Sequence, residues 1–170
     1  MSPNLELLFI FLLLVANAMF VMSELAIVSA RKVRLQQLAN QGNIRAQVAF
    51  ELASSPTEFL GTVQMGTTLI TIISGAYGEE IIAQRIYPIL NFIPLYQVQV
   101  ARGIAVLIIT FLAIVLGELV PKRLASNHPD TIASIVAYPM KNLVKITYPI
   151  VFSLSFFTDT IERFLGIKHS

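Results

Sequence analysis

Four of the long stretches without a charged residue limit the fold of this chain more than any other feature. They cover Leu7–Ser23, Phe59–Gly78, Gly103–Gly117 and Ile146–Thr158, which are 17, 20, 15 and 13 residues long. An α-helix rises about 1.5 Å per residue, so about 20 apolar residues cross a hydrocarbon core of roughly 30 Å. We therefore expect a membrane protein.

The composition agrees with a bilayer environment. Of the 170 residues, 55% are hydrophobic and 13% are charged, with a mean hydropathy of +0.72. These values exclude soluble hydrolases, nucleic-acid-binding proteins and disordered tails. The chain has no cysteine, which excludes disulfides, thiolate metal sites and cysteine nucleophiles. It also lacks a Gly-rich phosphate loop, a Ser/His/Asp constellation and a zinc signature, so we do not predict an enzyme.

Three of the uncharged stretches reach the length of a membrane span once their flanks are included. The predicted spans are about residues 5–30, 59–79 and 101–120. They place Glu24 and Glu118 close to the hydrocarbon. The fourth stretch is short and follows Lys141 and Lys145, which favours a helix lying in the membrane interface. The first 30 residues contain no Lys or Arg, so a cleaved signal peptide is a poor alternative for the first span.

Basic residues gather on one predicted side of the membrane. The groups after the first and third spans are Arg31, Lys32, Arg34 and Arg45, and Lys122, Arg123, Lys141, Lys145, Arg163 and Lys168. Because cytoplasmic loops carry an excess of Lys and Arg, we expect an outside N-terminus and a cytoplasmic C-terminus. The predicted location is the cell (inner) membrane, in a multi-pass arrangement.

The segments outside the spans are also predicted to be helical. Residues 31–55 predict a polar helical hairpin that breaks at Asn40–Asn43, and residues 130–166 predict an apolar helix along the interface, interrupted by Pro139 and Pro149. The expected fold class is thus an all-α membrane protein with three transmembrane helices and cytoplasmic juxtamembrane helices that form a belt.

Glu118 is the sharpest candidate for function, because ionisable groups at membrane depth are costly and usually paired or functional. Pro121 cannot donate the hydrogen bond that the Gly117 carbonyl would otherwise accept. A freed carbonyl beside a carboxylate suits hard cations such as Mg²⁺ and Na⁺. The alternative is that Glu118 ends the helix and pairs with Lys122, four residues on.

The second predicted span contains several uncharged side chains with hydroxyl oxygens. Thr67, Thr71 and Ser74 share one helical face, with Thr68 and Gly75 adjoining. Their hydroxyl oxygens are candidate ligands. The alternative is close helix packing, for which membrane proteins use small and hydroxylated residues such as these.

In the first span, Ser23 and Glu24 are neighbours in sequence and point about 100° apart, so they would not serve one site equally. Glu24 is a candidate second acid or counter-ion site, and a pairing with Arg31 or Lys122 is the alternative.

Five segments, in order and spacing, resemble the membrane domain of the CNNM/CorC family, also called DUF21 or hemolysin-like. They are Ser23–Ala26, the basic stretch from Arg31 with Gln41–Asn43, Phe59–Thr62, Gly66 with its polar followers, and Gly117–Lys122.

The resemblance implies a homodimer in membrane lipid, with no nucleic-acid partner. In the family, three transmembrane helices and a belt surround an inward-facing cavity that binds Mg²⁺. Cytoplasmic CBS and CorC domains normally follow, and we expect them downstream of residue 170. Family members are linked to Mg²⁺ efflux that is often described as sodium-coupled, which makes Mg²⁺ the expected bound ion and Na⁺ a further one.

Carried over residue by residue, Glu118 matches the family's acid in the third helix, which acts with the carbonyl of the preceding Gly. Ser23 matches the Ser of the family's Ser-Glu pair. The resemblance therefore implies a metal site formed by Ser23, Thr67, Thr68, Thr71, Gly117 and Glu118. The threonines stand where many relatives have Asn, and Val21 stands where many have Ser.

Three hypotheses follow. The first is a Mg²⁺ exporter, because one acid with several neutral oxygens suits a compact ion. The second is an exporter of polyamines such as putrescine or cadaverine, held between Glu24 and Glu118. It draws on a branch of the family that shares Val63-Gln64 and lacks the Asn residues. The third is a non-transporting Mg²⁺ sensor.

Overall fold

The computed structural model describes residues 3–166, and within that range every element is helical. The elements are α1 (Pro3–Ser29), α2 (Lys32–Asn40), α3 (Ile44–Ser54), α4 (Pro56–Ile86), the 3₁₀ turn η1 (Tyr87–Leu90), α5 (Gln97–Ile114), the π-helical turn η2 (Val115–Leu119), α6 (Val120–Asn127) and α7 (Pro129–Phe164). Lys168, counted among the basic residues, lies outside the described residues.

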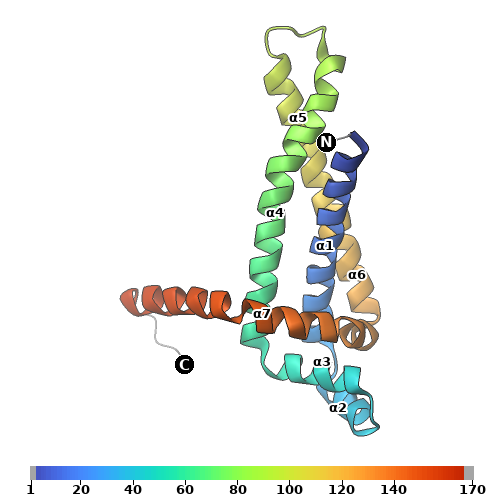
Figure 1. Cartoon of the computed structure of the whole chain (residues 1–170), viewed down its shortest axis with the longest axis vertical. Helices are drawn as coiled ribbons and strands as arrows, with labels where there is room; N and C mark the ends of the chain where they lie inside the picture. The colour runs from blue at the N-terminus through green and yellow to red at the C-terminus, as the bar shows by residue number, and fades with distance from the viewer. Residues whose placement is uncertain (1–2, 167–170) are drawn as a thin grey trace.

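Among the described residues, three helical segments are long and apolar enough to cross a membrane: Asn4–Ser29, Pro56–Leu90 and Gln97–Asn127. Figure 1 shows α1, α4 and the α5–α6 segment running side by side, with α7 lying across one end of them. We call α2, α3 and α7 the belt, and this end of the molecule the belt end. The all-helical class with three candidate spans is confirmed.

The polar hairpin forms where the sequence predicts it. Gly42 takes a φ of 92°, the left-handed region that glycine enters without strain, and this ends α2. The Asn43 side chain then accepts a hydrogen bond from the Ala46 backbone N–H at 3.1 Å and caps α3. By contrast, α7 continues as one helix through Pro139 and Pro149, so neither proline ends the interfacial segment.

The main core lies at the belt end and is built largely from alanine. It joins α1, α2, α3, α4, α6 and α7, and its members include Ala26, Leu35, Ala46, Ala49, Phe59, Ala125, Ala133 and Ala137. Small side chains let helix backbones approach closely when lipid gives no hydrophobic drive for association. The Thr62 and Thr147 hydroxyls, 2.9 Å apart and buried, add a polar link between α4 and α7.

Glycines fix how closely α4 approaches its neighbours. A Cβ on Gly66 would lie 2.5 Å from the Phe20 ring, and one on Gly78 would lie 2.8 Å from Ile109. Because Gly78 has no side chain, α4 can pack closely against α5 at this position. Gly75 has no atom within 4 Å of an added Cβ, because it faces open space.

Candidate functional site

A π-helical turn forms where the third span carries its acid. Pro121 has no N–H to donate to the Gly117 carbonyl, and the Val120 N–H instead bonds the Val115 carbonyl, five residues back. The Gly117 carbonyl accepts a hydrogen bond from Asn17 Nδ2 of α1 at 3.1 Å. The sequence predicts that the Gly117 carbonyl is freed, and the structure shows that Asn17 is its hydrogen-bond partner. Such π turns occur frequently at functional sites.

Gly117 is buried, and its missing side chain allows this contact. An added Cβ would lie 3.1 Å from Asn17 Nδ2, a distance at which one of the two groups must give way. Asn17 therefore ties the middle of α1 to the irregular turn that carries Glu118.

A pocket of about 230 Å³ lies beside this tie, between α1, α4, α5 and η2. We call it the central pocket, because it lies near the middle of α1 and α4. Its lining residues are Leu14, Asn17, Ile70, Thr71, Ser74, Gly75, Ile109, Thr110, Ala113, Ile114 and Glu118. They contribute one acid, one amide and three hydroxyls to an otherwise apolar wall.

Two oxygens at this pocket lack a hydrogen-bond partner. Asn17 Oδ1 and Ser74 Oγ are each buried and receive or give no hydrogen bond. Ser74 as a whole is 5% exposed. A buried polar group left unpaired costs roughly 1–3 kcal/mol, so such groups call for an explanation, such as a bound ion or water.

Glu118 both lines the central pocket and pairs with Lys122. Lys122 Nζ lies 2.6 Å from Glu118 Oε1, and the two side chains are 46% and 47% exposed. The helix-end pairing that the sequence allowed is therefore present. An exposed pair of this kind contributes only about 0.2–1 kcal/mol, which a bound cation could readily offset.

The structure brings together some of the predicted ligands and separates others. Thr71 and Glu118 line the central pocket. Gly117 is not a lining residue, but its carbonyl accepts a hydrogen bond from Asn17, which is one. Ser23 is buried, donates to the Met19 carbonyl at 2.6 Å, and lines an apolar cavity between α1 and α7 instead. Thr67 donates to the Val63 carbonyl at 3.0 Å, and neither Thr67 nor Thr68 is among the residues lining the central pocket.

Glu24 is partly buried and takes part in none of the ion pairs found among residues 3–166. It does not pair with Arg31 or Lys122 and is not a lining residue of the central pocket.

Asn17 and Thr110 are pocket residues that the sequence did not single out. Asn17 is the one amide inside the first uncharged stretch, and an amide at that depth is itself an unusual choice. Its partner lies 100 residues away, which no local pattern reveals.

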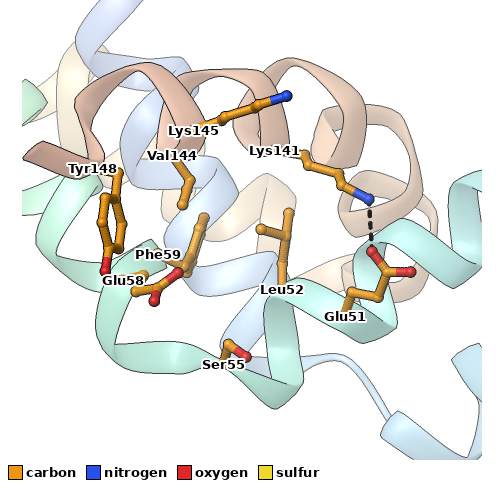
Figure 2. A pocket seen from close by; sticks show the side chains of 9 residues that line it. All are labelled: Glu51, Leu52, Ser55, Glu58, Phe59, Lys141, Val144, Lys145 and Tyr148. Atoms are coloured by element: carbon orange, nitrogen blue, oxygen red, sulfur yellow. Dashed lines mark hydrogen bonds and ion pairs between the residues drawn. The ribbon is translucent and has the colours of Figure 1, made fainter.

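A second cavity, of about 410 Å³, lies at the belt between α3, the start of α4, and α7. Figure 2 shows Lys141 bonded to Glu51, the hydroxyl end of Tyr148 pointing toward Glu58, and Lys145 extending away from both acids. The Lys141–Glu51 distance is 2.7 Å. Two ammonium groups in the lining disfavour a cation, so this belt pocket is the weaker candidate for a cation site.

Within residues 3–166, no group of three or more His, Cys, Asp or Glu side chains gathers as a metal site. A cation in this part of the chain would therefore be held by at most two such side chains, and mainly by neutral oxygens. That is the donor set of the central pocket.

The comparisons with known proteins agree with the fold. Residues 7–170 match the family described as the cyclin M transmembrane N-terminal domain, CNNM. A UPF0053 protein of Synechocystis sp. is 48% identical over 98% of this chain. The polyamine export protein of Haemophilus influenzae is 32% identical over 89% of it, and the UPF0053 protein YugS of Bacillus subtilis is 30% identical over 95%.

The chain spans about 38% of the Synechocystis and Bacillus relatives and 34% of the Haemophilus protein. The similarity therefore concerns a membrane domain of longer proteins. This chain belongs to the CNNM family of membrane proteins, which includes a polyamine export protein.

Proposed function

We propose that this chain is the membrane domain of a divalent-cation exporter, with Mg²⁺ as the ion that it binds in the central pocket. The observation that carries the proposal is the donor set: Glu118 is the one acid among the lining residues, and Asn17, Thr71, Ser74 and Thr110 add neutral oxygens. Mg²⁺ takes oxygen ligands and is commonly bound through one or two carboxylates.

The depth of the pocket supports a transport role. Asn17 and Ser74 lie near the middle of helices that run Pro3–Ser29 and Pro56–Ile86. Transporters place their substrate sites near the bilayer midplane, at irregular helix segments such as η2. An ionisable residue there points to an ion pathway.

Export of a polyamine is the second candidate, favoured by the similarity to the Haemophilus polyamine export protein. A diamine has two separated charges and needs an acid at each end. Glu24 would be the second acid, but it is not a lining residue of the pocket that holds Glu118. The compact ion is therefore the better match.

Lys122 gives the site a means of release. Its ammonium, 2.6 Å from Glu118 Oε1, occupies the carboxylate that an incoming cation would use. A cation must displace this tethered charge, and the charge returns when the ion leaves. Na⁺ would compete for the same carboxylate, which is how we propose that sodium couples to efflux.

The orientation and the assembly belong to the same proposal. Arg31, Arg34 and Lys141 lie at the belt end, so we place that end in the cytoplasm. Thr71 and Thr110 line the central pocket and are exposed on the surface of the chain near mid-span. Hydroxyls facing lipid at that depth are unfavourable, and a second copy of the chain covering this side would complete the pocket.

Titration calorimetry of the chain in lipid nanodiscs tests the proposal. Mg²⁺ and, separately, putrescine are added to wild type and to Glu118→Gln, at low and at high Na⁺. We expect saturable Mg²⁺ binding that Na⁺ weakens and that Glu118→Gln abolishes. Putrescine binding without a response to Mg²⁺ would overturn the proposal.

The double replacement of Glu24 and Glu118 by Gln separates the two candidates further. A metal site should depend chiefly on Glu118, so Glu24→Gln alone should leave Mg²⁺ binding nearly unchanged. A diamine site should need both acids.

A further inference from the structure

We propose that Asn17 and Ser74 are direct ligands of the transported cation, through Asn17 Oδ1 and Ser74 Oγ. Neither residue belongs to the ligand set that the family resemblance implies. The inference rests on the proposed function, because it names the neutral half of the same site. It also shifts that site away from Ser23, Thr67 and Thr68.

The hydroxyl of Ser74 is buried yet lacks the bond within its own helix that many hydroxyls in this protein make. Within residues 3–166, nine serines and threonines donate to the carbonyl four residues earlier, which satisfies them within their own helix. They are Ser23, Ser54, Thr62, Thr67, Ser134, Thr147, Ser153, Thr158 and Thr160. Ser74 makes no such bond, although it is 5% exposed and lines the central pocket. Its oxygen is left free where a ligand would sit.

Asn17 is held in the orientation that a ligand needs. Its Nδ2 donates to the Gly117 carbonyl at 3.1 Å, which fixes the plane of the amide. The opposite atom, Oδ1, is buried without a partner and belongs to a residue that lines the same pocket. One hydrogen bond thus positions the amide against the turn that carries Glu118 and leaves its better cation ligand free.

The two free oxygens come from different helices and meet at one pocket. Asn17 lies on α1 and Ser74 on α4, and Glu118 enters from η2. Two unpaired buried oxygens on one small cavity are unfavourable when it is empty, and a cation satisfies both at once. The chemistry favours a compact, largely dehydrated ion that draws ligands from three segments.

The test compares Ser74→Ala, Asn17→Leu and the control Ser134→Ala. Ser134 is a helical serine that satisfies its hydroxyl on the Asp130 carbonyl and lies outside the central pocket. Mg²⁺ affinity is measured by calorimetry in nanodiscs. The thermal midpoint is recorded with and without Mg²⁺, and Glu118→Gln is run in parallel.

We expect Ser74→Ala and Asn17→Leu each to weaken Mg²⁺ binding about tenfold, the effect of one lost contact to a charged ligand. Without Mg²⁺, Ser74→Ala should melt at the wild-type temperature or higher, because it removes an unpaired buried oxygen. Its rise in melting temperature on adding Mg²⁺ should shrink. A purely structural role would lower the midpoint without Mg²⁺ instead.

The outcomes separate this inference from the proposed function. If wild type binds Mg²⁺, Glu118→Gln does not, and Ser74→Ala and Asn17→Leu both bind like wild type, the ligand assignment is wrong and the proposed function stands. If wild type binds no Mg²⁺, both fail. Equal weakening in Ser134→Ala would also overturn the assignment, because that residue lies outside the pocket.

Discussion

The central pocket and the belt pocket are both lined by charged and apolar side chains, yet they suit different chemistry. The central pocket is the smaller, about 230 Å³ against about 410 Å³, and its charge comes from Glu118. The belt pocket sets Lys141 and Lys145 against Glu51 and Glu58. Its charges largely cancel, whereas the central pocket keeps unpaired oxygens.

The difference shows why size is a poor guide to function in a membrane protein. At the belt end, acids can pair with nearby ammonium groups, as Glu51 does with Lys141 at 2.7 Å. At mid-span each polar group is costly and needs a use. A small cavity with unsatisfied oxygens is therefore a better indicator of a binding site than a larger cavity whose acidic and basic residues balance.

The largest expected effect is the contrast between the acids of the two pockets. Glu118→Gln should weaken Mg²⁺ binding about a hundredfold or more, because it removes the one carboxylate that the pocket offers, and close charge pairs couple by roughly 1.5–7 kcal/mol. Glu58→Gln, in the belt pocket, should change it less than about twofold. Calorimetry on both variants measures the contrast, and similar losses in the two would remove the distinction between the pockets.

Two glycines of α4 test whether open space at the central pocket serves binding. Gly75→Val should keep the fold, because an added Cβ meets nothing within 4 Å, and should weaken Mg²⁺ binding about tenfold by filling the pocket. Gly66→Val should instead lower the free energy of unfolding by about 1–3 kcal/mol, because its Cβ would lie 2.5 Å from the Phe20 ring. Thermal unfolding and calorimetry separate the two effects. A destabilised Gly75→Val would contradict the open pocket.

Lys122→Gln should raise Mg²⁺ affinity about two- to fivefold, because the ion no longer has to displace an exposed pair that contributes about 0.2–1 kcal/mol. Release should slow to a similar degree. Stopped-flow dissociation measures the change, with Lys145→Gln as the matched control, since Lys145 lies in the belt pocket. Weaker binding in Lys122→Gln would mean that Lys122 does not compete with the ion.

The smallest effect is expected at the belt. Lys141→Ala should lower the free energy of unfolding by less than about 1 kcal/mol, because its pair with Glu51 is about half exposed. It should leave Mg²⁺ affinity within about twofold of wild type. Denaturation in detergent checks the first value and calorimetry the second. A large loss of binding would link the belt pocket to the central one.

Much of the fold was predictable because the bilayer reduces the choices. Uncharged runs near 20 residues specify spans, and Gly42 with Asn43 specifies the break between α2 and α3. The sequence did not reveal that α7 continues through Pro139 and Pro149. Each proline removes a helical hydrogen bond, and we attribute the continuity to packing of α7 against the main core, which no local pattern shows.

The site was predictable only in part. Pro121 reveals the freed carbonyl of Gly117 locally, and Glu118 follows from its depth. Asn17 could not be paired with Gly117, because the contact joins residues 100 positions apart. Helical periodicity placed Thr67, Thr71 and Ser74 on one face but could not tell which hydroxyls bond within α4 and which stay free.

The most direct test of the central claim is Mg²⁺ flux through the chain in liposomes that enclose a Mg²⁺-sensitive dye. We predict flux in wild type that falls to the level of protein-free liposomes in Glu118→Gln, with Glu58→Gln behaving as wild type. Saturable Mg²⁺ binding without flux would contradict the claim and favour a sensor. Equal flux in wild type and Glu118→Gln would place the pathway outside the central pocket.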